Sequence, residues 1–196
     1  MQIKQCRYIL NTLNRIAEKN KLPVTPRIHS RIFLDNTAAS ANPYTAEINL
    51  NKIFSFYIFR PLITRIIKHE SKHIEQYQIM ARYFAGLSKN IDKGLNNFKG
   101  FILQKFPYYN WLEFNERFYK QTIAKDGVIK KGHPLFEKAK EYVKALRQYP
   151  DMSPFNDLEV LSEKGVKEMF KNKWRKKKLY KSNFLEKEAR MAEKQK

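Results

Sequence analysis

Apolar residues in the first quarter of the chain recur with two different periods. Between residues 3 and 19 they return at helical spacing, and the segment ends before the turn-forming stretch KNKLPVTP, which predicts a first helix. Residues 27–35 are rich in β-forming side chains, and residues 45–53 alternate apolar with polar positions, as a half-buried strand does. The stretch DNTAASANPY between them has turn chemistry throughout. We therefore expect two short strands joined by a loop, as part of a small antiparallel sheet.

The clearest helical pattern covers residues 54–87, where apolar side chains recur at intervals of three and four. Partial helical periodicity follows near 93–105, 110–124, 135–148 and 155–173. A last helix is predicted after Ser182 or Asn183, either of which can cap it. The pattern as a whole predicts an α+β fold that is predominantly helical, with the small antiparallel sheet packed beside the long helix.

Composition limits the class of protein. A chain of 196 residues with 42% apolar content can bury one substantial core, so we expect a single domain over residues 1–196. Cys6 is the one cysteine, which excludes an intramolecular disulfide and favours a reduced, cytoplasmic setting. No stretch approaches the roughly 20 apolar residues that cross a bilayer, and the first residues do not resemble a cleaved signal. We expect a protein without a membrane span, located in the cytoplasm or packaged in a virion.

A formal net charge of +20 attracts phosphate polymers. Residues 164–196 contain 13 Lys or Arg against 4 Glu, centred on WRKKKLYK at 174–181. The segment 164–181 is therefore a candidate for nucleic-acid contact, and a solvated helical face explains it equally well.

The candidate chemistry lies in HESKH, residues 69–73, inside the long helix. Positions four apart share one helix face, so His69 and His73 can direct ring nitrogens at one zinc ion. Glu70 follows the first histidine and can lie beside the metal as a general base. The alternative is that both histidines are ordinary packing or surface residues.

The strand TAEINLNKI followed by the helix with KHESKHIEQY resembles the zincin metallopeptidases, in particular compact bacterial and phage members. The resemblance implies a Zn²⁺ cofactor, a metal-activated water that attacks a peptide bond, and Glu70 as the general base. It also implies that an edge strand, here residues 45–53, holds a protein or peptide substrate by main-chain pairing. Tyr180, Tyr108 and Tyr109 are conceivable donors to the oxyanion, and the sequence does not choose among them.

The resemblance also requires a third ligand. In the metzincin pattern a histidine stands six positions after the second one, where this chain has Ile79. His29 precedes the helix on a predicted strand, and His133 lies in a predicted turn. The gluzincin pattern, in which a glutamate on a later helix completes the site, remains.

Two glutamates compete for that place. YKSNFLEKEARMAE resembles the gluzincin third-ligand helix, because Glu186 is followed three residues later by the small Ala189. Glu113, with Glu116 at the same offset, lies closer to His73 in sequence. We favour Glu186 over Glu113. The family often has Asp or Asn four residues after the ligand, where this chain has Arg190.

Two other interpretations stay open. Glu186, Glu113 and their neighbours Glu188 and Glu116 can all be solvent-facing helix charges paired with nearby Lys or Arg. The chain can also be a basic nucleic-acid-associated or virion structural protein whose HESKH helix is vestigial.

Overall fold

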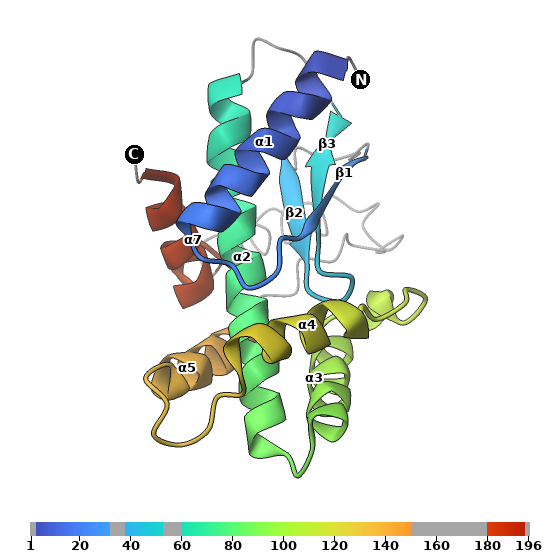
Figure 1. Ribbon diagram of the computed structural model, residues 1–196, viewed down its shortest axis with the longest axis vertical. Coiled ribbons are helices and arrows are strands. Elements are labelled where there is room, and N and C mark those ends of the chain that lie inside the picture. The colour runs from blue at the N-terminus through green and yellow to red at the C-terminus, as the bar shows by residue number, and fades with distance from the viewer. Residues whose placement is uncertain (1–2, 32–37, 53–59, 150–179, 195–196) are drawn as a thin grey trace, which may run out of the picture.

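The computed structural model describes residues 3–31, 38–52, 60–149 and 180–194, and its fold is α+β and predominantly helical (Figure 1). The first helix, α1, spans Ile3–Lys19 as predicted. Its buried side chains Ile9, Leu13 and Ile16 follow helical spacing and join the hydrophobic core. The amphipathic pattern therefore fixes both the length of α1 and the face that it buries.

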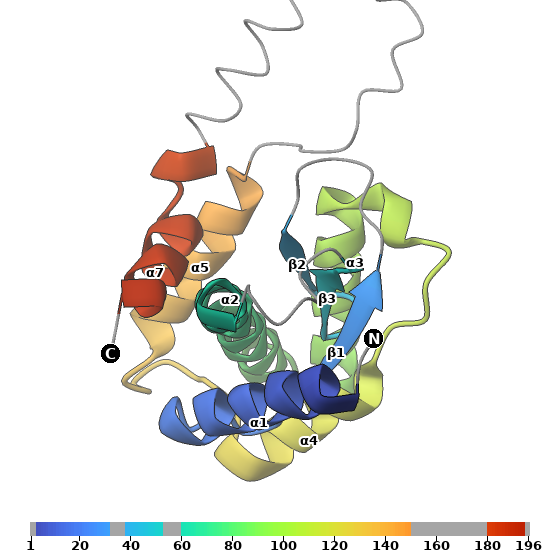
Figure 2. The same cartoon turned by 90° about the horizontal axis from the view of Figure 1, so that it is seen from above.

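Helix α2, Arg60–Leu87, runs through the middle of the molecule and carries the HESKH stretch. It contacts α1, α3, α4, α5, α7 and the strands β2 and β3. Viewed from above, α5 and α7 lie on one side of it and the sheet and α3 on the other (Figure 2). Because neighbours surround α2, its apolar residues Ile63, Ile67, Ile74 and Met80 are fully buried. Of the predicted span 54–87, residues 54–59 lie outside the described part.

The sheet has three strands in the order β1-β3-β2: β1 is Arg27–Arg31, β2 is Ala39–Asn42 and β3 is Glu47–Asn51. In β3, Ile48 and Leu50 are buried as predicted, but Asn49 between them is buried as well, so the strand is not half-buried. The expectation of an antiparallel pair was wrong, because β1 pairs with β3 in parallel. The antiparallel partner of β3 is β2, which lies in the stretch expected to be a loop.

A tight turn explains this difference. Backbone N–H groups of Tyr44 and Thr45 donate to the side-chain oxygen of Asn42, and Ala46 has a φ of 56°. This turn folds β2 directly back onto β3, so that β1 can pair only with the opposite edge of β3. Small residues with weak strand preference, such as Ala39 and Ala41, concealed β2 in the sequence.

The remaining helices surround α2 (Figure 1). They are α3 at Ile91–Lys105, the short 3₁₀ helix η3 at Pro107–Tyr109, α4 at Glu116–Asp126, α5 at Phe136–Arg147 and α7 at Phe184–Lys194. Predicted segments 93–105 and 135–148 are confirmed, whereas only the second half of 110–124 is α-helical, because Asn115 caps α4. Asn183 caps α7 by accepting a hydrogen bond from the N–H of Leu185. The predicted segment 155–173 lies outside the described residues.

Within the described residues, the helices are too short or too polar to cross a membrane.

Candidate metal centre

His69 and His73 lie on one face of α2, one helical turn apart, as their spacing predicts. Their Nε2 atoms are 3.2 Å from each other. His73 is buried, and the side chain of His69 is 13% exposed. The opposite face of α2 is held in the core by Ile67 and Ile74, so both imidazoles point toward α7.

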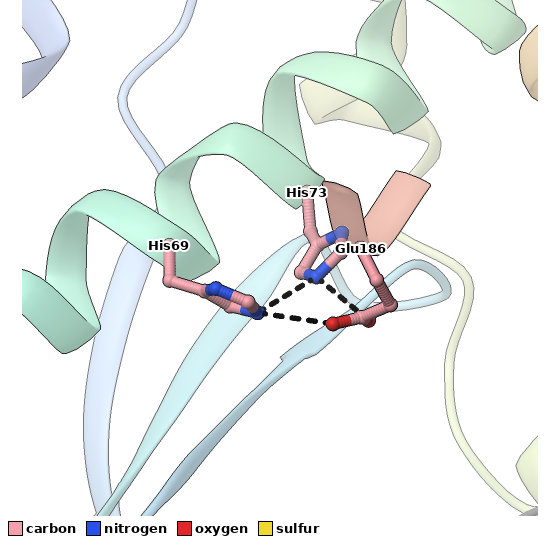
Figure 3. A group of neighbouring side chains, drawn as sticks. All are labelled: His69, His73 and Glu186. Atoms are coloured by element: carbon pink, nitrogen blue, oxygen red, sulfur yellow. Dashed lines mark hydrogen bonds and ion pairs between the residues drawn. The ribbon is translucent and has the colours of Figure 1, made fainter. Parts of the chain in front are cut away.

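Glu186, in the first turn of α7, completes the cluster, as Figure 3 shows. Its Oε1 is 3.2 Å from His73 Nε2, and its Oε2 is 3.4 Å from His69 Nε2. Glu186 is fully buried, and so are Leu185 and Ala189 on the same helix. The small side chain of Ala189, which is itself completely buried, lets α7 lie against α2.

The other candidates for the third ligand lie elsewhere. Glu113 is exposed, and exposed Glu116 pairs with Lys120 at 2.7 Å. His29 is exposed and pairs with Glu47 on the sheet. His133 accepts a hydrogen bond from the N–H of Leu135 in a turn. The structure thus brings together the two histidines and Glu186, the glutamate that the sequence favoured.

The Nδ1 atoms of both rings face hydrogen-bond acceptors. His69 Nδ1 lies 2.6 Å from Glu193 Oε1, and a carboxylate can only accept there. His73 Nδ1 lies 2.9 Å from Gln76 Oε1. The amide nitrogen of Gln76 donates to Leu185 O and to Glu188. These two bonds orient the amide of Gln76 so that its oxygen faces the ring of His73. Both imidazoles therefore carry their hydrogen on Nδ1, and both Nε2 atoms present lone pairs to the cluster.

Three hydrogen-bond acceptors, the two Nε2 atoms and the carboxylate of Glu186, thus face one point. A cation at that point, either a proton or a metal ion, is needed to hold them together. Two Nε2 lone pairs and a carboxylate repel one another unless a proton or a metal ion lies between them. Oε2 of Glu186 is buried and has no hydrogen-bond partner among the described residues. Ligand atoms about 2.0–2.1 Å from a tetrahedral zinc ion are about 3.4 Å apart. The two Nε2 atoms are 3.2 Å apart, and His73 and His69 lie 3.2 Å and 3.4 Å from the two different oxygens of Glu186. The donor set fits Zn²⁺ in chemistry and in spacing.

The ionisation of the cluster reflects the same demand. Burial alone would raise the pKa of Glu186. When the rings hold a proton in place of a metal ion, hydrogen bonds and positive charge from His69 and His73, with a hydrogen bond from Tyr149, lower this pKa below its ordinary value. Burial alone would lower the pKa of His69, but contact with Glu186 and the nearby charge of Glu70 raise it. Negative charge on Glu186 and positive charge between the rings thus stabilise each other.

Glu70 lies beside the cluster and is not one of its ligands. Its side chain is buried, and this burial raises its pKa, although His73 and His69 partly oppose the rise. The backbone N–H of Ala41 on β2 faces its carboxyl group and also opposes the rise in pKa. A carboxyl with a raised pKa, next to a cation site, suits the transfer of protons.

The edge of the sheet beside Glu70 is β2. The expectation that residues 45–53 pair with a substrate was wrong, because β3 is the central strand and both of its edges are occupied by β1 and β2. Ala38 O accepts from the N–H of Asn51 on β3, so by alternation the backbone groups of Ala39 and Ala41 face away from β3. Among the described strands, the sheet edge that lies next to the candidate site and has no neighbouring strand is therefore that of β2.

Two tyrosines, Tyr149 and Tyr180, lie next to Glu186. Tyr149 donates from its hydroxyl to Glu186 Oε1 at 2.7 Å, and its ring lies 5.5 Å from that of Tyr180. Burial and the charge of Glu186 raise the pKa of Tyr180, which keeps this phenol protonated. Of the other two tyrosines considered from the sequence, Tyr109 packs against Tyr44 and Tyr108 is 44% exposed.

Sequence reasoning missed Gln76, Glu193 and Tyr149. Gln76 could have been found, because it lies three residues after His73 on the same helix face. Of the predicted basic segment 164–181, Tyr180 and Lys181 alone are described.

Comparisons of the chain with protein-family models, with curated proteins and with solved structures found no match.

Proposed function

We propose that this protein is a zinc-dependent metallopeptidase of the gluzincin kind, with His69, His73 and Glu186 as metal ligands. One observation carries the proposal: three acceptor side chains from α2 and α7 converge at zinc-like spacing beside a buried glutamate, Glu70, that is not among them. A purely structural helix does not need two imidazole lone pairs and a carboxylate directed at one point.

Zn²⁺ held by such ligands supplies a Lewis acid, which polarises a carbonyl group and lowers the pKa of water. Glu70 accepts the proton from the attacking water, and it then delivers that proton to the nitrogen of the leaving amine. The raised pKa of Glu70 brings it closer to neutrality, where a carboxylate can both take up and release a proton. Burial between α2 and β2 keeps the carboxyl group in place for both transfers.

The edge of β2 offers a place for the substrate. An extended peptide can add to a free sheet edge by main-chain hydrogen bonds. The outward-facing backbone groups of Ala39 and the carbonyl of Ala41 supply such bonds, and the small side chains of both residues let the peptide come close. Because the N–H of Ala41 also contacts Glu70, a peptide on this edge lies next to the proposed base.

Metal analysis tests the ligand set. Protein incubated with zinc and dialysed should retain about one equivalent in the wild type and close to none in His73→Ala and Glu186→Ala. Glu113→Ala removes the competing glutamate, which is exposed, and serves as the matched control that retains the metal. A wild type without bound zinc, or a Glu186→Ala variant that keeps it, would overturn the assignment.

The role of Glu70 is tested separately. Glu70→Gln should retain zinc, because Glu70 is not a ligand, and should lose hydrolysis of an unstructured protein such as casein. Measurable cleavage by a zinc-loaded Glu70→Gln protein would refute the role of Glu70 as the base.

The net charge of +20 favours a second candidate function, a basic nucleic-acid-associated or virion structural protein. The charge is not confined to residues 164–196, because the described residues contain 30 Lys or Arg against 13 Asp or Glu. DNA or RNA binding that weakens steeply with salt, together with a zinc-free wild type, would favour this function over the peptidase.

A further inference from the structure

The ring of His69 is held at both nitrogens by one helix, α7. Glu186 faces its Nε2 at 3.4 Å, and Glu193 faces its Nδ1 at 2.6 Å. The contact with Glu193 joins residues 124 positions apart in the sequence. Glu193 is partly exposed, with 35% of its side-chain surface accessible, so it is not held there by burial alone.

Helix geometry explains why the second contact comes from residue 193. Seven residues make close to two turns of an α-helix, so Glu186 and Glu193 lie on one face of α7, roughly 10 Å apart along its axis. Arg190, one turn after Glu186, is exposed. The acidic side chain that contacts His69 Nδ1 is thus two turns after Glu186, and the small Ala189 in the turn between them is fully buried.

The two histidines differ in the partner at Nδ1. His73 donates to the neutral amide of Gln76, which is fully buried and fixed by its own bonds to Leu185 O and Glu188. His69 donates to a carboxylate, which strengthens the bond and increases the electron density at Nε2. His69 is also the more exposed of the two rings, so it depends more on a specific contact for its orientation.

We propose that Glu193 is the positioning residue of the metal centre: it holds His69 in the Nδ1–H form, aims Nε2 at the cation and thereby sets the zinc affinity. This inference rests on the proposed function to the extent that the centre binds zinc. Glu193 thus orients His69, whereas Arg190, one turn after Glu186, does not.

Zinc affinity, measured by competition with a chromophoric chelator, tests the proposal. Glu193→Ala should weaken zinc binding by about 10- to 100-fold, the usual cost of losing such a partner. Glu193→Gln should recover part of the loss, because its amide oxygen can accept from Nδ1–H without the negative charge. Glu137→Gln, which removes an exposed carboxylate from α5, is the control that should leave affinity unchanged.

A spectroscopic measurement separates positioning from a general effect on folding. Nitrogen-15 spectra of the histidine rings in zinc-loaded protein should show a protonated Nδ1 and a metal-bound Nε2 for His69 in the wild type and in Glu193→Gln. In Glu193→Ala the His69 signals should broaden or shift, while those of His73 remain. Wild-type affinity in Glu193→Ala, or unchanged His69 signals, would overturn the role of Glu193. Absence of zinc binding in the wild type would instead overturn the proposed function.

Discussion

The hydrogen on each imidazole decides what His69 and His73 can do. Had their Nδ1 atoms faced donors, each Nε2 would carry a hydrogen and could not bind a metal. Glu193 and the oriented amide of Gln76 place the hydrogens on the far side of each ring. Two acceptors behind the rings therefore leave both Nε2 atoms able to bind a metal ion, as the proposed function requires.

At the same scale, zinc binding should depend on pH. The metal needs the Nε2 lone pair of His69, and a proton competes for it. The pKa of His69 is raised above its ordinary value of 6.5, because Glu186 and Glu70 outweigh burial. As pH is lowered, the apparent zinc affinity should therefore start to decrease while the pH is still above 6.5. Below the raised pKa of His69 it should decrease roughly tenfold for each pH unit. Chelator competition across neutral pH measures this, and a constant affinity down to about pH 6 would contradict it.

In the metal-free protein the same proton has the opposite effect. A group whose pKa is raised on folding stabilises the folded state below its unfolded-state pKa. The contribution of His69 to the free energy of unfolding should thus be complete below pH 6.5 and lost as pH rises through the raised value. Urea unfolding of chelator-treated wild type and His69→Gln at several pH values isolates this contribution. A difference between the two that grows with pH would contradict the expectation.

At the scale of elements, α3 crosses α2 closely at one glycine. A Cβ atom on Gly94 would lie 2.4 Å from Ala85 Cα, whereas one on Gly100 of the same helix would meet nothing within 4 Å. Gly94→Ala should lower the free energy of unfolding by about 1–3 kcal/mol through overpacking. Gly100→Ala, the matched control, should raise it by about 0.5–1 kcal/mol through helix propensity. Chemical denaturation measures both, and equal stability of Gly94→Ala and wild type would show that the helices separate easily.

The helices could be predicted from sequence because each follows a local rule. Apolar spacing located α1, α2, α3 and α5, and the cap at Asn183 located the beginning of α7. The sheet could not be predicted fully, because β2 has small residues and its pairing depends on the turn from Asn42 to Ala46. Missing β2 also led to the wrong strand for substrate pairing, because β2 and β1 occupy the two edges of β3 and make it the central strand.

At the scale of the whole molecule, the candidate site was only partly predictable. The spacing of His69 and His73 is local, so one helix fixes it. The small Ala189 three residues later favoured Glu186 over Glu113, but the approach of Glu186 to the histidines depends on how α7 packs against α2. The contact of Glu193 with His69 depends on the register between the same two helices, and it was not foreseen.

Zinc should stabilise the whole fold, because its ligands lie on two helices that are distant in sequence. A ligand that binds only the folded state adds about 2.7 kcal/mol at a free concentration of 100 times its dissociation constant. The melting temperature of the wild type should rise with zinc and fall with chelator, and that of His73→Ala should respond to neither. A zinc-dependent rise in His73→Ala equal to that of the wild type would place the metal elsewhere.

The distance between the two helices along the chain has a consequence for biosynthesis. Glu186 follows His73 by 113 residues, which a ribosome translates in roughly 6 to 23 seconds at 5–20 residues per second. Throughout that interval the nascent polypeptide holds both imidazoles without their carboxylate. The proposed reaction can begin only after α7 has emerged from the exit tunnel, so translation itself would delay the onset of activity.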